Sequence, residues 1–221
     1  MAKNLHEAFL RLILSNNIGA KTALNLVNAV LNSNASNFNS KSNYNYEIIF
    51  NLPDLNLTNL INLGVKLTKQ QYDALHILPA NFKEYIEKHN AWLAQSEQHH
   101  FITILDDNYP KQLLNLADAP IALYIKAQPQ NLTQLNQISI AMVGSRKATH
   151  NGLDTAFNFA KDLAEQGFPI ISGLADGIDA KAHEGALHNH KPTIAVIGTG
   201  IDIIYPSKHK ELAKILLSTA V

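Results

Sequence analysis

The chain has 221 residues, a formal net charge of zero and 46% hydrophobic residues, which predicts a globular protein of one large or two small domains. It contains no cysteine, which excludes disulfides, thiolate metal sites and a cysteine nucleophile and favours a reducing, cytoplasmic compartment. We expect no signal peptide and no membrane contact, because no basic segment precedes an apolar run and no such run approaches the ~18 residues of a membrane span. The zero net charge disfavours a broad DNA-binding surface, but it permits a local site of backbone amides and a few cations.

The N-terminal segment predicts two helices joined by a short turn. Residues 5–14 carry apolar side chains at helical spacing, and a second such pattern begins near Leu24. The turn Asn16-Asn17-Ile18-Gly19 resembles a helix-hairpin-helix element, which can direct backbone N–H groups at a phosphate. Asn17 stands where that element usually has its first glycine, and asparagine also adopts the left-handed conformation. The alternative is a plain helical hairpin in a small bundle.

Short helical segments continue to residue 80. A tract rich in asparagine and serine at 32–45 predicts a loop, and helical patterns follow near 46–50, 57–63 and 69–78. Pro79 closes this set, and a longer helix is expected at 82–93. We therefore predict a small all-α domain at residues 1–80 and a second domain at residues 81–221.

From Phe101 the pattern changes to apolar strands that alternate with amphipathic helices. Strands are expected at 101–105, 121–125, 138–143, 169–172 and 193–197, and helices at 151–166, from Ile178 and from Pro206. Such alternation implies right-handed crossovers. It predicts an α/β fold, namely a Rossmann-like parallel sheet with helices on both faces.

Glycine turns follow three of the predicted strands, and they read Gly144-Ser145-Arg146-Lys147, Ser172-Gly173 and Gly198-Thr199-Gly200. The carboxyl ends of parallel strands meet at one edge of a sheet, where the N–H groups of such turns favour anions. The chain has two arginines, at 11 and 146, against sixteen lysines. A guanidinium group binds a phosphate through two bonds and lysine does not, so Arg146 is a candidate anion ligand.

Enzymatic and metal sites are the alternatives. Neither G-x-G-x-x-G nor a Walker-type loop is present, which disfavours a dinucleotide or P-loop enzyme. Asp179 and His183 lie four residues apart on one helix and, with Ser172 or Ser145, could form a hydrolase triad, although no G-x-S-x-G turn accompanies them. His183, His188 and His190 lack the spacing of a known metal motif. We expect no catalysis, no metal and no cofactor.

Three long motifs resemble the DNA-processing protein A (DprA/Smf) family. They are Ala141-Met142-Val143-Gly144-Ser145-Arg146, then Ser172-Gly173-Leu174-Ala175-x-Gly177-Ile178-Asp179-x-x-Ala182-His183, then Ala195-Val196-Ile197-Gly198-x-Gly200-Ile201-Asp202-x-x-Tyr205-Pro206. The Tyr109-Pro110-x-x-Leu113 segment and the N-terminal helices look similar to the same family.

The resemblance implies a SAM-like helical domain followed by an extended Rossmann-like domain. It implies non-catalytic binding of single-stranded DNA, protection of incoming strands during natural transformation, loading of RecA recombinase, and a homodimer in the full-length protein. Carried over by motif, the DNA-binding residues would be Gly144, Ser145, Arg146, Lys147, Ser172, Gly173, Gly177, Lys181, Gly198, Thr199 and Gly200.

The chain departs from the family pattern in two places. The position between Ala175 and Gly177 is often basic in the family but is Asp176 here, and an acid at a phosphate-binding edge repels; Lys147 and Lys181 are candidate replacements. The family's domain also continues beyond the length seen here, so we expect Val221 to end a truncated form.

Two other functions are compatible with such a sheet. A nucleotide-cleaving phosphoribohydrolase of the lysine-decarboxylase-like group has a similar fold and similar phosphate turns, but its P-G-G-x-G-T turn and catalytic glutamate are missing. A protein-interaction scaffold that docks through its helical domain is the other alternative.

Overall fold

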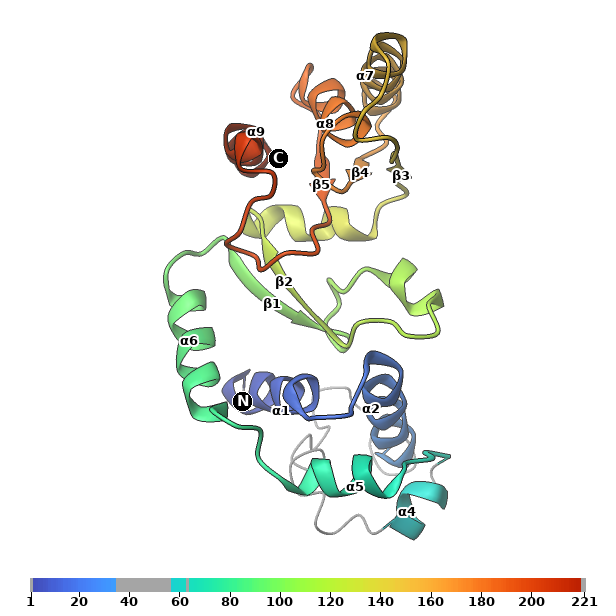
Figure 1. Cartoon of the computed structure of the whole chain (residues 1–221), viewed down its shortest axis with the longest axis vertical. Coiled ribbons are helices and arrows are strands. Elements are labelled where there is room, and N and C mark those ends of the chain that lie inside the picture. The colour runs from blue at the N-terminus through green and yellow to red at the C-terminus, as the bar shows by residue number, and fades with distance from the viewer. Residues whose placement is uncertain (1, 35–56, 63, 220–221) are drawn as a thin grey trace. The chain divides into compact units, whose positions relative to one another are not determined.

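The computed structural model describes residues 2–34, 57–62 and 64–219 (Figure 1). Its contacts divide the chain into two compact units, Met1–Ser96 with Phe101–Leu123 and Glu97–His100 with Tyr124–Val221. The helices and strands of the N-terminal half are α1 (Ala2–Leu14), α2 (Ala20–Asn34), α4 (Leu57–Asn62), α5 (Lys69–His76), α6 (Phe82–Ala94), β1 (His99–Thr103), the 3₁₀ helix η3 (Lys111–Asn115) and β2 (Ala122–Lys126). Those of the C-terminal half are η4 (Pro129–Asn136), β3 (Ile140–Ala141), α7 (His150–Glu165), β4 (Ile170–Ser172), α8 (Ile178–Leu187), β5 (Thr193–Ala195), η5 (Ser207–His209) and α9 (Lys210–Thr219).

The first unit is organised around the apolar faces of its helices. Phe9 and Leu12 of α1 and Val27 of α2 are at most 1% exposed, as their helical spacing predicts. Leu75 of α5 and Phe82 of α6 complete the same core. Burial of this shared face supplies most of the stability, because isolated helices of this length are marginal in water.

The turn between α1 and α2 has the conformation that its sequence predicts. Asn17 has φ of 61°, the left-handed value, and Ile18 beside it is buried. The side-chain amide of Gln71 on α5 donates a hydrogen bond to the Asn17 carbonyl at 3.2 Å. The hairpin is therefore confirmed and is tied to α5, whereas its interpretation as a DNA-binding element stays a prediction.

Some boundaries differ from those predicted. Helix α2 continues to Asn34, into the tract expected to be a loop, and the helix predicted near 46–50 lies outside the described residues. Helix α6 belongs to the first unit because Phe82 and Ile86 pack in that unit's core. The compact units therefore do not reproduce a boundary at residue 80, and the division into domains 1–80 and 81–221 stays a prediction.

The two strands predicted near residues 101 and 121 form a sheet of their own, in which β1 pairs with β2. The loop between them is fixed by Tyr109, which is 2% exposed and donates its hydroxyl to the Pro120 carbonyl at 2.6 Å. Helix η3 begins directly after Pro110.

The parallel sheet consists of β3, β4 and β5 in that order. Ile140 pairs with Ile170, and Ile170 pairs with Thr193. The ladder continues past β3 through the Met142 amide, which donates to the Ile171 carbonyl at 2.9 Å. The α/β class and the parallel sheet are thus confirmed, and the glycine turns after these strands start from the same edge.

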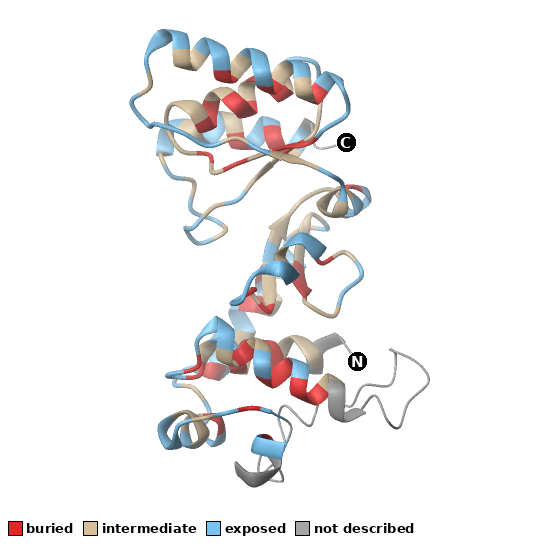
Figure 2. Ribbon diagram, turned by 90° about the vertical axis from the view of Figure 1, so that its right-hand side faces the viewer, coloured by how far each residue is buried: buried red, intermediate tan, exposed pale blue. Residues whose placement is uncertain are grey.

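Helices α7 and α8 pack closely against each other over the sheet. Their contact is made of small residues, with Ala160 and Ala164 of α7 and Ala182 and Ala186 of α8 in one core cluster with Ile170. A side chain at Gly185 would collide with the Phe157 carbonyl, so glycine is required where the helices meet. As Figure 2 shows, α8 is the inner helix, and most of its residues are buried.

Both helices belong to crossovers that advance in the same direction along the sheet, which places them on the same face. Alternate residues along the strands point to the opposite face of the sheet. On that face, Val143 and Val196 are 74% and 64% exposed. Helices over this second face stay a prediction.

His183 is the most deeply buried titratable group of the second unit, with 0% exposure. The Thr193 hydroxyl donates to the Ile170 carbonyl at 2.8 Å, so its oxygen accepts a hydrogen bond from His183 Nδ1, also at 2.8 Å. Nε2 has no hydrogen-bond partner among the described residues. Burial lowers the pKa of His183 to about 4, although the nearby Asp179 acts in the opposite direction.

We predict that His183 makes the protein acid-sensitive. Above pH 6.5 the imidazole is neutral in both the folded and unfolded states and has no effect on the pH dependence. As pH falls from 6.5 to 4, only the unfolded state takes up the proton, so the free energy of unfolding drops, by about 3 kcal/mol at pH 4. Urea denaturation at pH 7, 5 and 4 should show a smaller loss for His183→Asn, whose amide N–H replaces Nδ1–H. An unchanged pH dependence in this variant would contradict the prediction.

Candidate functional site

The three glycine turns surround one pocket of about 250 Å³. Arg146 comes from the first turn, Gly173 and Asp176 from the second, and Gly198 and Thr199 from the third. Tyr205, which is 67% exposed, and Pro206 close the pocket from the segment after the third turn. The prediction that the turns lie side by side is therefore confirmed for the residues of this pocket.

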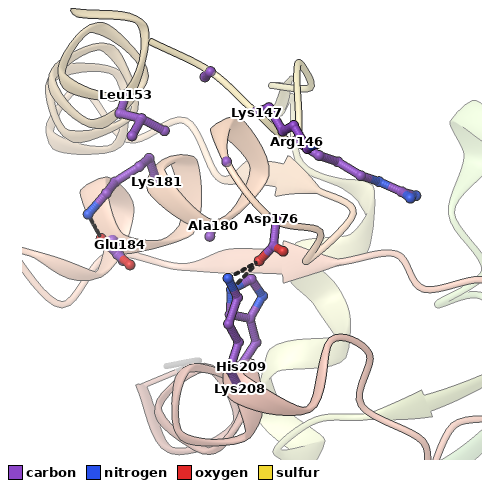
Figure 3. Close-up of a pocket in the computed structure, with 11 residues that line it drawn as sticks. Arg146, Lys147, Leu153, Asp176, Ala180, Lys181, Glu184, Lys208 and His209 are labelled. Carbon is purple, nitrogen blue, oxygen red and sulfur yellow. Dashed lines mark hydrogen bonds and ion pairs between the residues drawn. The ribbon is translucent and has the colours of Figure 1, made fainter. Parts of the chain in front are cut away.

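A second pocket of about 300 Å³ adjoins the first and shares Arg146 and Asp176 with it (Figure 3). Charged residues dominate its lining, and these are Arg146, Lys147, Asp176, Lys181, Glu184, Lys208 and His209. The site is thus a pair of small depressions separated by Arg146 and Asp176.

The first and second turns are locked together by backbone contact at Gly177. The Ile178 amide donates to the Ser145 carbonyl at 3.2 Å, and Gly177 has φ of 77°. A Cβ at Gly177 would collide with the Ser145 carbonyl and approach the Arg146 Cα to 3.0 Å. Only glycine combines this conformation with so close an approach, which explains why the Gly177 position matters to the site.

A buried carboxylate lies beneath the same two turns. Asp179 is 7% exposed, and its oxygens accept hydrogen bonds from the Gly173 amide at 3.1 Å and from the Gly144 amide at 3.4 Å. These two N–H groups, which we expected to face an anion, therefore bind an anion that the protein itself supplies. Their contribution to the site is to hold the turns through Asp179.

The hydroxyl groups of the predicted site are also engaged within the fold. Ser172 is 2% exposed and donates to the Met142 carbonyl at 2.6 Å, which joins β4 to the end of β3. Thr199 donates to the Ile203 carbonyl at 2.6 Å and closes its own loop. Ser145 accepts a hydrogen bond from the Lys147 amide at 3.1 Å. Among these three, Ser145 alone keeps its hydroxyl hydrogen for a ligand.

The predicted cations differ in their availability. Lys181 is paired with Glu184 at 2.5 Å on the same helix, so much of its charge is neutralised. Arg146 and Lys147 are exposed, and neither forms a salt bridge within the described part of the chain. Arg146 and Lys147 of the first turn are therefore available to a ligand, whereas Lys181 of α8 is already paired.

Asp176 turns toward η5. Its Oδ1 lies 2.7 Å from Lys208 Nζ and 3.3 Å from His209 Nε2. The hydrogen bond from Lys208, helped by the charges of His209 and Arg146, lowers the pKa of Asp176 and keeps it ionised. Sequence reasoning missed Lys208 and His209, because no residue pattern indicates that the start of the last helix reaches the second turn.

The backbone of the second turn is strained at Leu174, which has φ of 57°, a conformation that costs a residue other than glycine about 1–2 kcal/mol. Its side chain is 1% exposed and packs with Ala213 and Leu216 of α9, and His209 Nδ1 bonds to its carbonyl at 2.9 Å. Burial on one side and a hydrogen bond on the other hold the turn in this form, and strain of this kind is common at binding sites.

The hydrolase alternative finds no matching geometry. Ser172 is bonded to Met142 and His183 to Thr193, so neither faces the other as nucleophile and base. Within the described residues, no group of three or more His, Asp or Glu side chains could hold a metal ion. In the same residues, no helix combines the length and apolarity that a membrane span requires.

A family model described as "DNA recombination-mediator protein A" matches residues 100–221, which is more than half of the chain. The chain belongs to the DNA recombination-mediator protein A family. All three glycine turns and both pockets lie within the matched residues.

Similar proteins carry related names. The DNA processing protein DprA of Streptococcus pneumoniae is 42% identical over 136 residues, which cover 61% of this chain and 47% of that protein. Protein Smf of Escherichia coli is 39% identical over 135 residues, covering 61% of this chain and 35% of that protein. The chain thus spans less than half the length of both relatives. The X-ray structure of DprA from S. pneumoniae matches with a TM-score of 0.52 at 30% identity, covering 89% of this chain and 64% of that chain.

We predict that Asp179→Asn destabilises this recombination-mediator fold. An asparagine retains one acceptor oxygen and places an N–H group opposite a backbone amide that is itself a donor. The free energy of unfolding should fall by about 1–3 kcal/mol, the cost of leaving a buried donor unsatisfied. Urea denaturation at pH 7 measures the change. Asp162→Asn, at an exposed position of α7, is the matched control and should stay within about 0.5 kcal/mol of the wild type. Equal stability of Asp179→Asn and wild type would show that the carboxylate does not hold the turns.

Proposed function

We propose that this chain binds single-stranded DNA at the edge formed by the three turns and catalyses no reaction there. The observation that carries the proposal is the position of Arg146. It is an exposed cation without a salt bridge among the described residues, and it lines both pockets. A guanidinium group at such a place can bind a backbone phosphate bidentately while neighbouring nucleotides occupy the pockets on either side.

The preference for single strands follows from the pocket that contains Tyr205. Its lining also includes the apolar Ile197 and Pro206 beside the polar Arg146, Asp176 and Thr199, so an exposed aromatic ring borders a pocket of mixed polarity. An unstacked base can stack on such a ring, whereas the bases of a duplex are already stacked inside the helix. Stacking does not depend on base identity, so we expect little sequence preference.

The proposed binding mode depends on few charges. Because the chain has no net charge, attraction to DNA comes from the local cations, chiefly Arg146 and Lys147. We expect moderate affinity and a shallow salt dependence compared with a protein that has a broad basic face.

The family membership supports a role for this binding in recombination. Similar proteins are named DNA processing proteins, and the matching family model is described as a recombination mediator. We infer that the protein protects incoming single strands and loads RecA recombinase onto them during natural transformation, as a homodimer in the cytoplasm. Because the chain spans less than half of the relatives' length, these partners are proposals for the whole protein.

We predict that Arg146→Ala weakens the binding of fluorescent oligo-dT by about ten- to a hundredfold, since a charge-assisted phosphate contact contributes roughly 1.5–3 kcal/mol. Fluorescence anisotropy at two salt concentrations should also show a salt slope smaller by about 0.7 for the lost phosphate contact. Arg146→Lys should lose less affinity, because it keeps the charge but not the bidentate geometry.

Two results would contradict this function. Wild-type affinity in Arg146→Ala would show that the edge is not the binding site. Release of a free base from a nucleoside monophosphate by the purified chain would identify a nucleotide-cleaving enzyme instead. A duplex of the same length serves as the competitor, and it should compete poorly with oligo-dT.

A further inference from the structure

Asp176 lines both pockets, and basic side chains lie near its carboxylate. Lys208 Nζ lies 2.7 Å away and His209 Nε2 3.3 Å away, and the charge of Arg146 also acts on it. Figure 3 shows Asp176 between the stem of Arg146 and the side chains of Lys208 and His209. Asp176 is therefore the counter-ion of Lys208, and Arg146 from another segment acts on it only through its charge.

The pairing of Lys208 with Asp176 can be exchanged easily. The Lys208 side chain is 65% exposed, and an ion pair with so exposed a lysine contributes little to stability. Lysine has a flexible four-carbon stem, so its ammonium group can move to another anion without a change in the backbone. A phosphate that enters beside Arg146 offers such an anion.

His209 holds the backbone of Lys208 at the site, even when the ammonium group of Lys208 moves to another anion. Its side chain is 12% exposed, and its two ring nitrogens contact the Leu174 carbonyl at 2.9 Å and Asp176 at 3.3 Å. The residue next to Lys208 is thus anchored to the second turn at two points. Lys181, by contrast, is paired with a carboxylate three residues away on its own helix, which moves together with it.

We propose that Lys208 is a further phosphate-binding residue, held at the edge by Asp176 until a DNA phosphate replaces that carboxylate as its counter-ion. The proposal rests on the single-stranded DNA binding proposed above. It assigns Asp176 a positioning role: its charge is compensated in the free protein, and it keeps a lysine at the place where the strand arrives. Asp176, which the sequence suggests would repel a phosphate, thus holds the lysine that binds the phosphate.

The test separates a direct phosphate contact from mere neutralisation of Asp176. In the wild-type background, Lys208→Ala removes a cation and also exposes the charge of Asp176, so it cannot distinguish the two roles. Lys208→Ala is therefore made in the Asp176→Asn background, where no acid needs neutralising. We expect oligo-dT binding about three- to tenfold weaker than in Asp176→Asn alone, with a salt slope smaller by about 0.7. Equal affinity of the double and single variants would overturn the proposal.

A matched control lies on α9, the helix that directly follows η5. Lys214 pairs with Glu211 at 2.7 Å, both side chains are more than 70% exposed, and neither residue lines either of the two pockets described above. Lys214→Ala in the Glu211→Gln background should leave affinity and salt slope unchanged. If it weakens binding as much as the Lys208 variant does, the effect reflects net charge and the proposal fails.

Failure of this inference is distinguishable from failure of the proposed function. If the wild-type chain binds no oligonucleotide, or if Arg146→Ala binds normally, the function itself is wrong and Lys208 has no phosphate to contact. If Arg146→Ala weakens binding while Lys208→Ala in the Asp176→Asn background does not, only the role of Lys208 is wrong. Circular dichroism of every variant confirms that the fold is retained before the affinities are compared.

Discussion

The site depends on the buried carboxylate of Asp179. Its two oxygens accept the amides of Gly144 and Gly173, which belong to turns 29 residues apart in the chain. A carboxylate removed from water is costly unless hydrogen bonds satisfy it, and the turn amides provide those bonds. The first and second turns are thus held by the same charge, and the close contact of Gly177 with Ser145 fixes the distance between them.

In the second unit, some cations near the site are paired with carboxylates and others are exposed. Lys181 is neutralised by Glu184 and Lys208 by Asp176, whereas Arg146 and Lys147 stay exposed on the first turn. A protein without net charge can bind an anionic polymer when a few cations converge on one edge, because local potentials depend on where charges lie and not only on their sum. The exposed ring of Tyr205 beside these cations adds a surface for stacking.

Much of the fold was predictable because it follows from short-range regularities. The amphipathic pattern at 151–166 predicted α7, and the apolar runs at 138–143, 169–172 and 193–197 predicted the parallel strands. The left-handed Asn17 followed from its place in a turn. The division of the chain into units was harder to predict. The pattern of α6 indicates an amphipathic helix, but it does not indicate which core Phe82 packs into, because that depends on contacts with residues distant in the chain.

The sequence by itself determined the α/β class, the three glycine turns and the prominence of Arg146, because periodicity, turn chemistry and composition are local properties. Only the tertiary structure decided what each polar group faces. It assigned the turn amides to Asp179, Ser172 to Met142 and Asp176 to Lys208, each through a partner that is distant in the chain. The physical reason is that a hydrogen bond or an ion pair depends on distance and direction in space, and the crossovers of the sheet set both.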